Sequence, residues 1–173
     1  MSFASDIVSR TKWGARDPKE TETMQTPVKI VFIHHTAGKP CTTPEEDIKT
    51  VKGIQNFHMD ERKWADIGYN FLVNNSGQVF EARGWDRVGA HTKGWNAASV
   101  AFSVIGNFNE SNPDQRAIKA VLGMIQLGVD KGKISNDYKL YGHRDVGATD
   151  CPGKNLYEII KKWKHYSEEK PTK

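Results

Sequence analysis

Cysteine is scarce in this chain. The 173 residues contain only two, Cys41 and Cys151, whereas small secreted domains that depend on disulfides carry several pairs. A single disulfide between the two is one alternative, but it would consume a thiol that could otherwise hold a metal ion. The low count therefore excludes a disulfide framework as the basis of the fold.

Long apolar runs are also absent. No run approaches the ~20 residues that a bilayer-spanning helix needs, so no membrane span is expected. The start, Met1 to Val8, lacks the apolar core of a secretory signal peptide; either the protein is not exported by that route or a signal has been removed. With no internal repeat, we expect one domain over residues 1–173, with a core at about 8–165 and a polar tail at 167–173.

The excess of positive charge is small. The net charge is +4 and the sequence pI is about 9.0, a weak field that suits an anionic polymer such as nucleic acid or bacterial cell wall. The basic residues do not gather into a nucleic-acid patch, and the densest run, residues 161–164, is typical of the solvated face of a terminal helix. We therefore expect no nucleic-acid partner.

The hydrophobic patterns predict an α/β fold, with a mixed central β-sheet and helices packed on it. Strands are expected at residues 27–34, 68–73, 78–82, 99–105 and 138–141, and helices at about 43–58, 112–129 and 156–163. The inward face of the second helix is expected to comprise Ile118, Val121, Leu122, Ile125 and Leu127.

One stretch, Tyr141 to Gly153, carries the strongest chemical signal. It places His143 and Cys151 eight residues apart, and the proline and glycine that follow the cysteine put it on a turn. Far upstream, the first expected strand ends in His34 and His35. Two imidazoles and one thiolate form the three-ligand set of a catalytic zinc with one open position. The alternatives are hydrogen-bonded structural histidines, an inert buried thiol and a Cys–His nucleophilic pair.

A second signal is the long irregular segment Arg83–Asn96, which is rich in glycine and aromatic residues. Loops of this length within a compact domain are usually functional. Aromatic rings alternating with hydrogen-bonding groups suit a glycan-peptide, because sugar faces stack on rings and peptide edges need donors. The segment is therefore a predicted groove wall.

Seven motifs give these residues a family resemblance. In chain order they are Val8-Ser-Arg-x-x-Trp-Gly-Ala15, Ile33-His-His-Thr-Ala-Gly38, Asp66-Ile-Gly-Tyr-Asn-Phe-Leu-Val73, Gly77-Gln-Val-Phe-Glu-x-Arg-Gly-Trp85, Gly89-Ala-His91, Val104-Ile-Gly-Asn-Phe108, and Gly142-His-Arg-Asp145 with Thr149-Asp-Cys-Pro-Gly153. Together they resemble the peptidoglycan recognition proteins, which share a fold with type-2 N-acetylmuramoyl-L-alanine amidases. The resemblance runs from about Val8 to Trp163.

The resemblance implies a zinc site made of His34, His143 and Cys151. It also implies that zinc activates a water molecule for attack on the amide between N-acetylmuramic acid and L-alanine. Tyr69 and Thr149 match catalytic positions of the family; the alternatives are a core aromatic for Tyr69 and a simple turn residue for Thr149. A groove for peptidoglycan or muropeptides is implied as well. Its expected substrate-binding residues are His35, Trp64, Gly84, Trp85, His91 and Asn96, with ordinary core packing as the alternative for Trp85.

The Gly84-Trp85 pair favours muropeptides of the diaminopimelic type. Glycine leaves room for a substrate, and the indole walls the pocket. The extra carboxylate of diaminopimelate needs a cation or several N–H donors. The expected strand at 99–105 contains no arginine, and Arg83 and Arg87 flank the pair. We therefore expect a modest preference for the diaminopimelic type.

The chain departs from many animal members of the family in one respect. Cys41 matches one half of a short disulfide that follows the His-His-Thr loop, but the segment around Asp47 offers no second cysteine. A secreted location is favoured, with a cytoplasmic one as the alternative. Because Cys151 is kept, we expect a zinc amidase; the alternatives are a non-catalytic peptidoglycan receptor of innate immunity and a phage or bacterial lysis enzyme.

Overall fold

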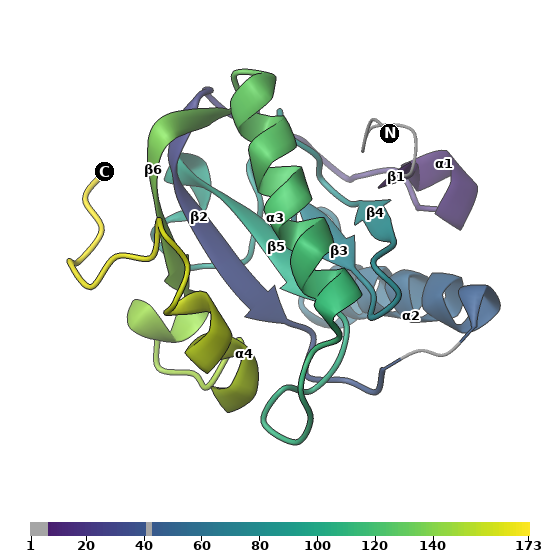
Figure 1. Ribbon diagram of the computed structural model, residues 1–173. Coiled ribbons are helices and arrows are strands. Elements are labelled where there is room, and N and C mark those ends of the chain that lie inside the picture. The colour runs from purple at the N-terminus through teal and green to yellow at the C-terminus, as the bar shows by residue number, and fades with distance from the viewer. Residues whose placement is uncertain (1–6, 41–42) are drawn as a thin grey trace.

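A six-stranded mixed sheet forms the centre of the molecule (Figure 1). The computed structural model describes residues 7–40 and 43–173, so Cys41 lies outside the described residues. The strands follow the spatial order β1-β4-β3-β5-β2-β6. Their bounds are β1 Ile7–Val8, β2 Val28–His35, β3 Phe71–Val73, β4 Val79–Glu81, β5 Ser99–Val104 and β6 Ile134–Gly142.

The register of the central strands brings distant segments of the chain together. β2 pairs in parallel with β5, where His34 lies opposite Ser103, and with β6, where Ile33 lies opposite Gly142. β3 and β4 form an antiparallel hairpin. Because β2 and β6 are parallel neighbours, the residues that end both strands meet at one edge of the sheet.

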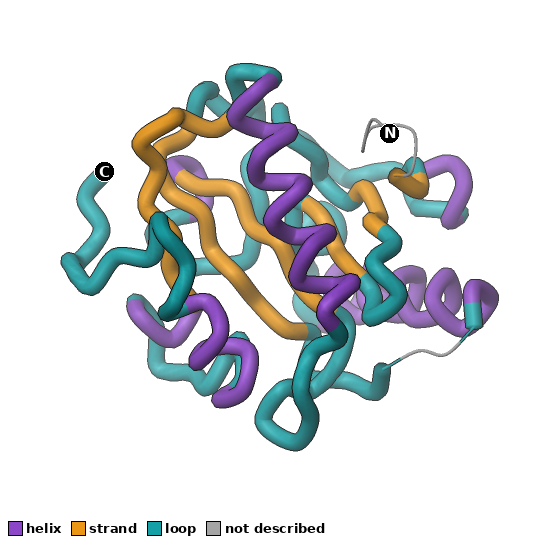
Figure 2. The backbone as a smooth tube through the Cα atoms, in the orientation of Figure 1, coloured by secondary structure: helices purple, strands orange, loops and turns teal. Residues whose placement is uncertain are grey.

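Helices cover both faces of the sheet (Figures 1 and 2). α3 (Gln115–Asp130) and α4 (Lys154–Ile160) pack with the core on one face, whereas α1 (Arg10–Trp13) and α2 (Pro44–Asn56) pack with a second cluster on the other. Single turns complete the set: a π-turn at Phe57–Glu61 and 3₁₀ turns at Asn96–Ala98 and His143–Asp145.

Capping side chains define where the two long helices begin. The hydroxyl of Thr43 accepts a hydrogen bond from the backbone amide of Glu46 at 3.2 Å, and α2 follows with proline in its first turn. Asp114 caps α3 in the same way through the amide of Arg116. The expected second helix was therefore placed correctly but starts later than Asn112.

The predicted inward face of α3 was wrong at Leu122. Leu122 is 39% exposed, because it follows Val121 by one residue and so lies about 100° round the helix from that buried side chain. The face that meets the sheet is built instead on Val121, Met124 and Ile125, with small residues that allow close approach. Its buried members are Ala117, Ala120, Val121, Met124, Ile125 and Gly128.

Alternation along β2 sends its side chains to opposite faces. Val31 and Ile33 belong to the core beneath α3, while Phe32 packs on the other face against Ala101 and Tyr141. By the same alternation His34 points to the face opposite α3. There, one apolar cluster is packed against α1 and α2, and another contains Phe32. His34 therefore reaches the side of the sheet on which the candidate site is found.

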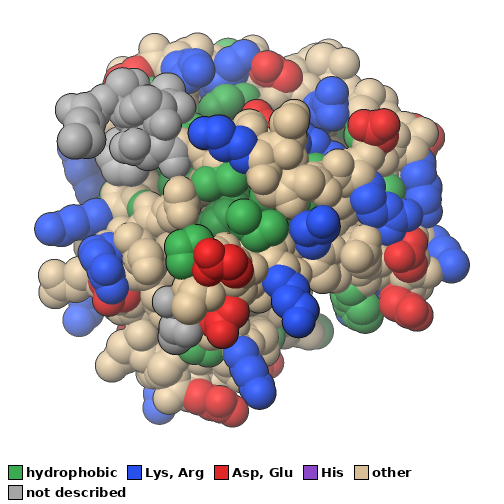
Figure 3. Space-filling model, turned by 90° about the vertical axis from the view of Figure 1, so that its right-hand side faces the viewer, with side chains coloured by type: hydrophobic (Ala, Val, Ile, Leu, Met, Phe, Trp, Pro, Cys, Tyr) green, Lys and Arg blue, Asp and Glu red, His purple; other side chains and the backbone are tan. Residues whose placement is uncertain are grey.

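The observed strands and helices confirm the expected α/β fold with a mixed sheet. Two short N-terminal elements, β1 and α1, were not predicted from the sequence. The polar tail begins beside β6: the amide of Ser167 donates to the Leu140 carbonyl at 3.1 Å, and Lys139 pairs with Glu169 at 2.8 Å. Among the described residues, no helix has the length and apolar character needed to cross a membrane. Basic and acidic side chains are interspersed on the face shown in Figure 3.

Candidate metal centre and substrate pocket

Three potential metal ligands converge at the edge of the sheet. His34 lies near the end of β2, His143 directly follows β6, and Cys151 sits on the turn before α4. One ligand atom from each lies within 4.8 Å of the others, and the Nδ1 atom of His34 is 3.4 Å from the Cys151 Sγ atom. The structure thus brings together the three residues that the sequence selected.

The protonation of these groups suits a cation. Burial lowers the pKa of His34 well below its ordinary value, helped by nearby His91 and His143, and burial also lowers the pKa of His143. Both rings are therefore neutral at pH 7, with a lone pair to offer. Burial raises the pKa of the Cys151 thiol to about 12, opposed by the hydrogen bond from the His35 backbone amide. A bound cation would displace the thiol proton.

The donor set fits zinc. Two imidazole nitrogens and one thiolate are the ligands that zinc selects, and three protein ligands leave a fourth position open, as in catalytic zinc sites. The backbone amide of His35 points at the Cys151 sulfur at 3.4 Å, which stabilises a thiolate. The Cys151 amide in turn donates to the Thr149 hydroxyl at 3.2 Å, so the turn that carries the thiol is itself held in place.

The Asp145 carboxylate anchors the turn that carries His143. One oxygen accepts from the amide of Gly142 at 2.9 Å. The other accepts from the hydroxyls of Tyr157 at 2.6 Å and Tyr166 at 3.2 Å. The aspartate of the Gly-His-Arg-Asp motif therefore ties the histidine turn to α4 and to the C-terminal segment.

A pocket of ≈ 330 Å³ opens above the three ligands. It is lined by His34, His35, Ala37, His58, Arg62, Trp64, Tyr69, Ala90, His91, His143, Thr149 and Cys151. The Tyr69 ring lies 5.4 Å from the His34 ring. Burial, followed by the charge of Cys151, raises the pKa of Tyr69 to about 12. At neutral pH its hydroxyl therefore carries a proton that it can donate.

One wall of the pocket is built from an aromatic and cationic group. His58 packs on Trp64 with ring centroids 4.6 Å apart, and the Arg62 guanidinium lies 5.8 Å from the centroid of the Trp64 ring. The His58 Nδ1 atom accepts a hydrogen bond from the amide of Gly68 at 2.9 Å. Between Arg62 and Trp64, Lys63 adopts a φ of 62°, which turns the chain sharply at the pocket rim.

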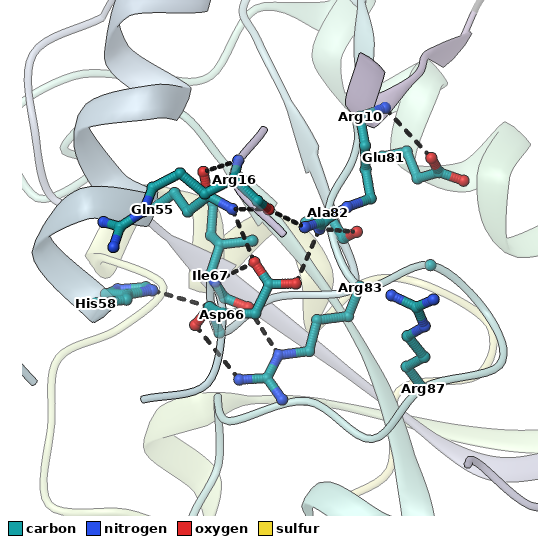
Figure 4. Close-up of polar contacts among 12 residues, drawn as sticks. Arg10, Arg16, Gln55, His58, Asp66, Ile67, Glu81, Ala82, Arg83 and Arg87 are labelled. Atoms are coloured by element: carbon teal, nitrogen blue, oxygen red, sulfur yellow. Dashed lines mark hydrogen bonds and ion pairs between the residues drawn. The ribbon is translucent and has the colours of Figure 1, made fainter. Parts of the chain in front are cut away.

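A buried carboxylate, Asp66, holds this wall against the rest of the protein (Figure 4). Its Oδ1 atom accepts from the Gln55 side chain at 2.9 Å and from the Ile67 amide at 2.8 Å. Its Oδ2 atom pairs with Arg10 at 2.9 Å. Arg83 adds a hydrogen bond from Nε to the Ile67 carbonyl at 2.7 Å. The wall segment is therefore tied to α1, to α2 and to the loop after β4.

Five of the eight expected catalytic and substrate-binding residues lie in the pocket: Tyr69, Thr149, His35, Trp64 and His91. Gly84, Trp85 and Asn96 do not line it. Trp85 packs instead against Phe71, at 4.6 Å between ring centroids, and against Phe102 in the core beneath α3. This is the packing role that was the alternative for Trp85 in the sequence analysis.

Asn96 makes side-chain hydrogen bonds within its own loop. Its side-chain oxygen accepts hydrogen bonds from the backbone amides of His91 at 2.9 Å and Thr92 at 2.8 Å. The amide side chain therefore holds the loop that presents His91. Gly84 likewise serves the loop, because its carbonyl accepts from the Asn70 side chain at 2.9 Å.

Sequence reasoning missed three polar residues in or beside the pocket: His58, Arg62 and Thr92. His58 was expected only as the end of the helix at about 43–58, whereas the structure places it in a π-turn at Phe57–Glu61 and at the pocket. The run of charged residues at 60–63 gave no sign that one of them would face a pocket. For Thr92, the available signal was its position directly after His91 in the sequence.

Comparison with known proteins identifies the family. The chain matches the family model "N-acetylmuramoyl-L-alanine amidase" over residues 24–154. Peptidoglycan-recognition protein SC2 of Drosophila simulans is 42% identical over 160 residues, which cover 92% of this chain and 87% of that protein. The chain therefore belongs to the peptidoglycan recognition proteins of the N-acetylmuramoyl-L-alanine amidase family.

Solved structures agree with this assignment. The complex of peptidoglycan recognition proteins LCa and LCx with tracheal cytotoxin contains a chain with a TM-score of 0.92 and 46% identity, covering 94% of this chain and 99% of that one. Peptidoglycan recognition protein LE, in complex with tracheal cytotoxin, a monomeric peptidoglycan of the diaminopimelic type, gives a TM-score of 0.92 at 40% identity, with coverage of 94% and 96%.

Proposed function

We propose that this protein is a zinc-dependent N-acetylmuramoyl-L-alanine amidase that binds peptidoglycan. The observation that carries the proposal is the convergence of His34, His143 and Cys151 within 4.8 Å of one another at a pocket. A protein that only binds has no need of a neutral two-histidine, one-thiol set next to its ligand. The set is complete in this chain.

The three ligands would hold the zinc ion, and the pocket residues would act on the substrate. Bound zinc supplies Lewis-acid activation of a water molecule and of the substrate carbonyl. Tyr69 donates its phenolic proton in a hydrogen bond to the oxygen on which negative charge develops, a role that requires it to be protonated at neutral pH. The raised pKa of Tyr69 meets that requirement.

Two further groups would orient the substrate. The hydroxyl of Thr149 lines the pocket and also accepts from the Cys151 amide, so it joins the position of the thiol to that of the substrate. The Nε2 atom of His91 is buried and has no hydrogen-bond partner within the described part of the protein. It therefore offers a free hydrogen-bonding group to a carbonyl or hydroxyl of a bound muropeptide.

A preference for the diaminopimelic type is part of the proposal. Two similar structures contain tracheal cytotoxin, which in one case is described as diaminopimelic-type peptidoglycan. In this chain the group that fits an extra carboxylate is Arg62, whose guanidinium lies at the pocket and over the Trp64 ring. We therefore assign the proposed selectivity for diaminopimelic muropeptides to this wall of the pocket and not to Gly84 and Trp85.

The second candidate is a receptor that binds peptidoglycan without cutting it. It is favoured by the names of the relatives, which are recognition proteins. Both candidates require the pocket, but only the enzyme requires zinc. Protein purified without chelators should contain one zinc ion per chain by elemental analysis, and its hydrolysis of peptidoglycan should stop on chelation and return when zinc is added. Zinc-free protein with chelator-resistant hydrolysis would contradict the zinc mechanism.

A further inference from the structure

A single buried hydroxyl lies between two histidine rings of the site. The Oγ1 atom of Thr92 is 3.1 Å from His34 Nε2 and 2.8 Å from His91 Nδ1. Thr92 is 2% exposed, and Asn96 fixes its backbone through the amide of Thr92. Thr92 itself does not line the pocket. The hydroxyl therefore acts only through the two rings that it touches.

The hydroxyl can donate only one hydrogen bond, and this limits the arrangement of protons. If Thr92 donates to one ring nitrogen, it must accept from the other. The free nitrogen of His34, Nδ1, faces the Cys151 sulfur at 3.4 Å. To bind a metal there, Nδ1 must keep its lone pair, so the neutral ring carries its proton on Nε2 and donates it to Thr92. The proton of Thr92 is then directed to His91 Nδ1.

The same chain of hydrogen bonds decides which nitrogen of His91 is protonated. With Nδ1 as an acceptor, the neutral ring of His91 carries its proton on Nε2. That atom is buried, has no partner among the described residues and belongs to a residue that lines the pocket. A buried N–H without an acceptor is costly. It is therefore positioned for a hydrogen-bond acceptor on a bound molecule.

The reverse direction would disable both functions. If His91 donated from Nδ1, Thr92 would donate to His34 Nε2, and His34 would carry its proton on Nδ1, where the metal must bind. His91 would then present a lone pair to the pocket instead of an N–H group. The metal site and the hydrogen-bonding character of the pocket therefore depend on one shared hydroxyl.

We propose that Thr92 is a positioning residue that fixes the tautomers of His34 and His91 together, leaving His34 Nδ1 free for the metal and His91 Nε2–H free for substrate. The inference rests on the proposed function only in taking zinc as the ion. Outer groups that orient a ligating histidine typically contribute about 10- to 100-fold to metal affinity. The substrate class that fits His91 is one with a carbonyl, carboxylate or hydroxyl oxygen.

The wild-type protein gives the first test, without any variant or peptidoglycan. Nitrogen-15 NMR of histidine-labelled protein, zinc-free and zinc-loaded, reports which ring nitrogen is protonated. The proposal predicts that His91 is neutral with its proton on Nε2 in both states, and that zinc-loaded His34 also carries its proton on Nε2. A His91 ring with its proton on Nδ1 would overturn the proposal.

Variants give the second test. Thr92→Val keeps the shape and removes the hydroxyl, Thr92→Ser keeps the hydroxyl, and Ser99→Ala is the matched control, because Ser99 is fully buried and donates to the Trp95 carbonyl at 2.7 Å. In competition with a chelator, Thr92→Val should bind zinc about 10- to 100-fold more weakly, while Thr92→Ser and Ser99→Ala keep the wild-type affinity.

The outcomes separate this proposal from the amidase proposal. Zinc affinity and ring protonation are measured without peptidoglycan, so a protein that never cleaves a muropeptide leaves both readouts intact. Wild-type zinc affinity in folded Thr92→Val would contradict the role of the hydroxyl. If Thr92→Val does not fold, the affinity of Thr92→Ser and the wild-type spectra decide: weak zinc binding by folded Thr92→Ser also contradicts the proposal.

Discussion

The Nδ1 atom of His34 lies 3.4 Å from the sulfur of Cys151, although 117 residues separate the two in the chain. The sheet accounts for this proximity. Parallel pairing of β2 with β6 places the end of one strand beside the other, and the segment after β6 turns back so that Arg144 donates from its amide to the Cys151 carbonyl at 2.8 Å. The ligand set therefore rests on strand register and on one short closed turn.

Removal of the Tyr69 hydroxyl tests its proposed role. Tyr69→Phe keeps the ring that packs 5.4 Å from His34 and loses only the donor. We expect the variant to fold and to bind one zinc ion, with hydrolysis slower by about 100-fold, the range for a single preorganised donor. Steady-state rates on a defined muropeptide measure this effect, and an unchanged rate would reduce Tyr69 to a packing residue.

Buried histidines should make the zinc-free protein sensitive to acid. Burial, with Arg62 and Arg83, lowers the pKa of His58 to about 4, below the value of about 6.5 expected in the unfolded chain. Between these two pH values the unfolded state takes up a proton that the folded state does not. Protonation of His58 in the unfolded state therefore does not reduce the free energy of unfolding above about pH 6.5. As the pH falls from about 6.5 towards 4, it reduces this free energy by about 1.4 kcal/mol per pH unit.

A variant isolates this contribution from those of the other buried histidines. His58→Gln removes the titrating ring, so the variant should take up about one proton fewer than the wild type on unfolding between about pH 6.5 and 4. Its free energy of unfolding should therefore fall less steeply with decreasing pH in this range. Urea titrations of both zinc-free proteins across this range measure the slopes. Equal slopes would show that the pKa of His58 is not lowered in the folded state.

The core position of Trp85 predicts an effect on stability and not on substrate choice. Trp85→Ala removes an indole that contacts Phe71 and Phe102 beneath α3. Because the ring is only partly buried, we expect a loss of about 3 kcal/mol in the free energy of unfolding, the low end for tryptophan truncation. The conservative Trp85→Phe and Gly84→Asn variants should keep the wild-type ratio of rates on diaminopimelic and lysine muropeptides. A changed ratio with unchanged stability would return this pair to the substrate site.

The selectivity itself is expected to depend on Arg62. In Arg62→Gln the pocket loses its guanidinium, and the preference for diaminopimelic over lysine muropeptides should fall to near unity, because the extra carboxylate then lacks a cation. Arg87→Gln is the control: it makes the same charge change at an exposed residue that does not line the pocket. Equal loss of preference in both variants would assign the effect to net charge alone.

The sequence predicted most of the elements on which the site is built. The strand before His34 was predicted because its apolar residues form a nearly continuous run, as in strands covered on both faces. Of the strand before His143, only residues 138–141 were predicted, because its first half, which starts at Ile134, is mostly polar. Motif chemistry indicated His143, Cys151 and a histidine from the pair at 34–35, since histidines at strand ends and a cysteine before Pro-Gly have few structural explanations together, and the resemblance implied His34. Only the family resemblance indicated that these ligands lie together in space, because the order of strands in the sheet cannot be predicted from local sequence patterns.

The pocket wall could not be predicted to the same degree. Trp64 and Trp85 both follow glycine- or charge-rich turns, yet one lines the pocket and the other enters the core. The difference depends on which face of the sheet each loop crosses. Trp85 packs closely against α3 at Gly128, where an added Cβ would lie 2.7 Å from the Trp85 ring. Short-range sequence does not encode such contacts.

The most direct test compares the wild type with Cys151→Ser. Serine replaces a soft anionic ligand with a neutral hydroxyl that holds zinc poorly, while the walls of the pocket stay in place. Mass spectrometry of digested peptidoglycan should show free stem peptides beginning with L-alanine for the zinc-loaded wild type and none for Cys151→Ser, although both proteins still bind the polymer. Binding without any released stem peptide from the zinc-loaded wild type, on either type of peptidoglycan, would contradict the amidase and leave a receptor.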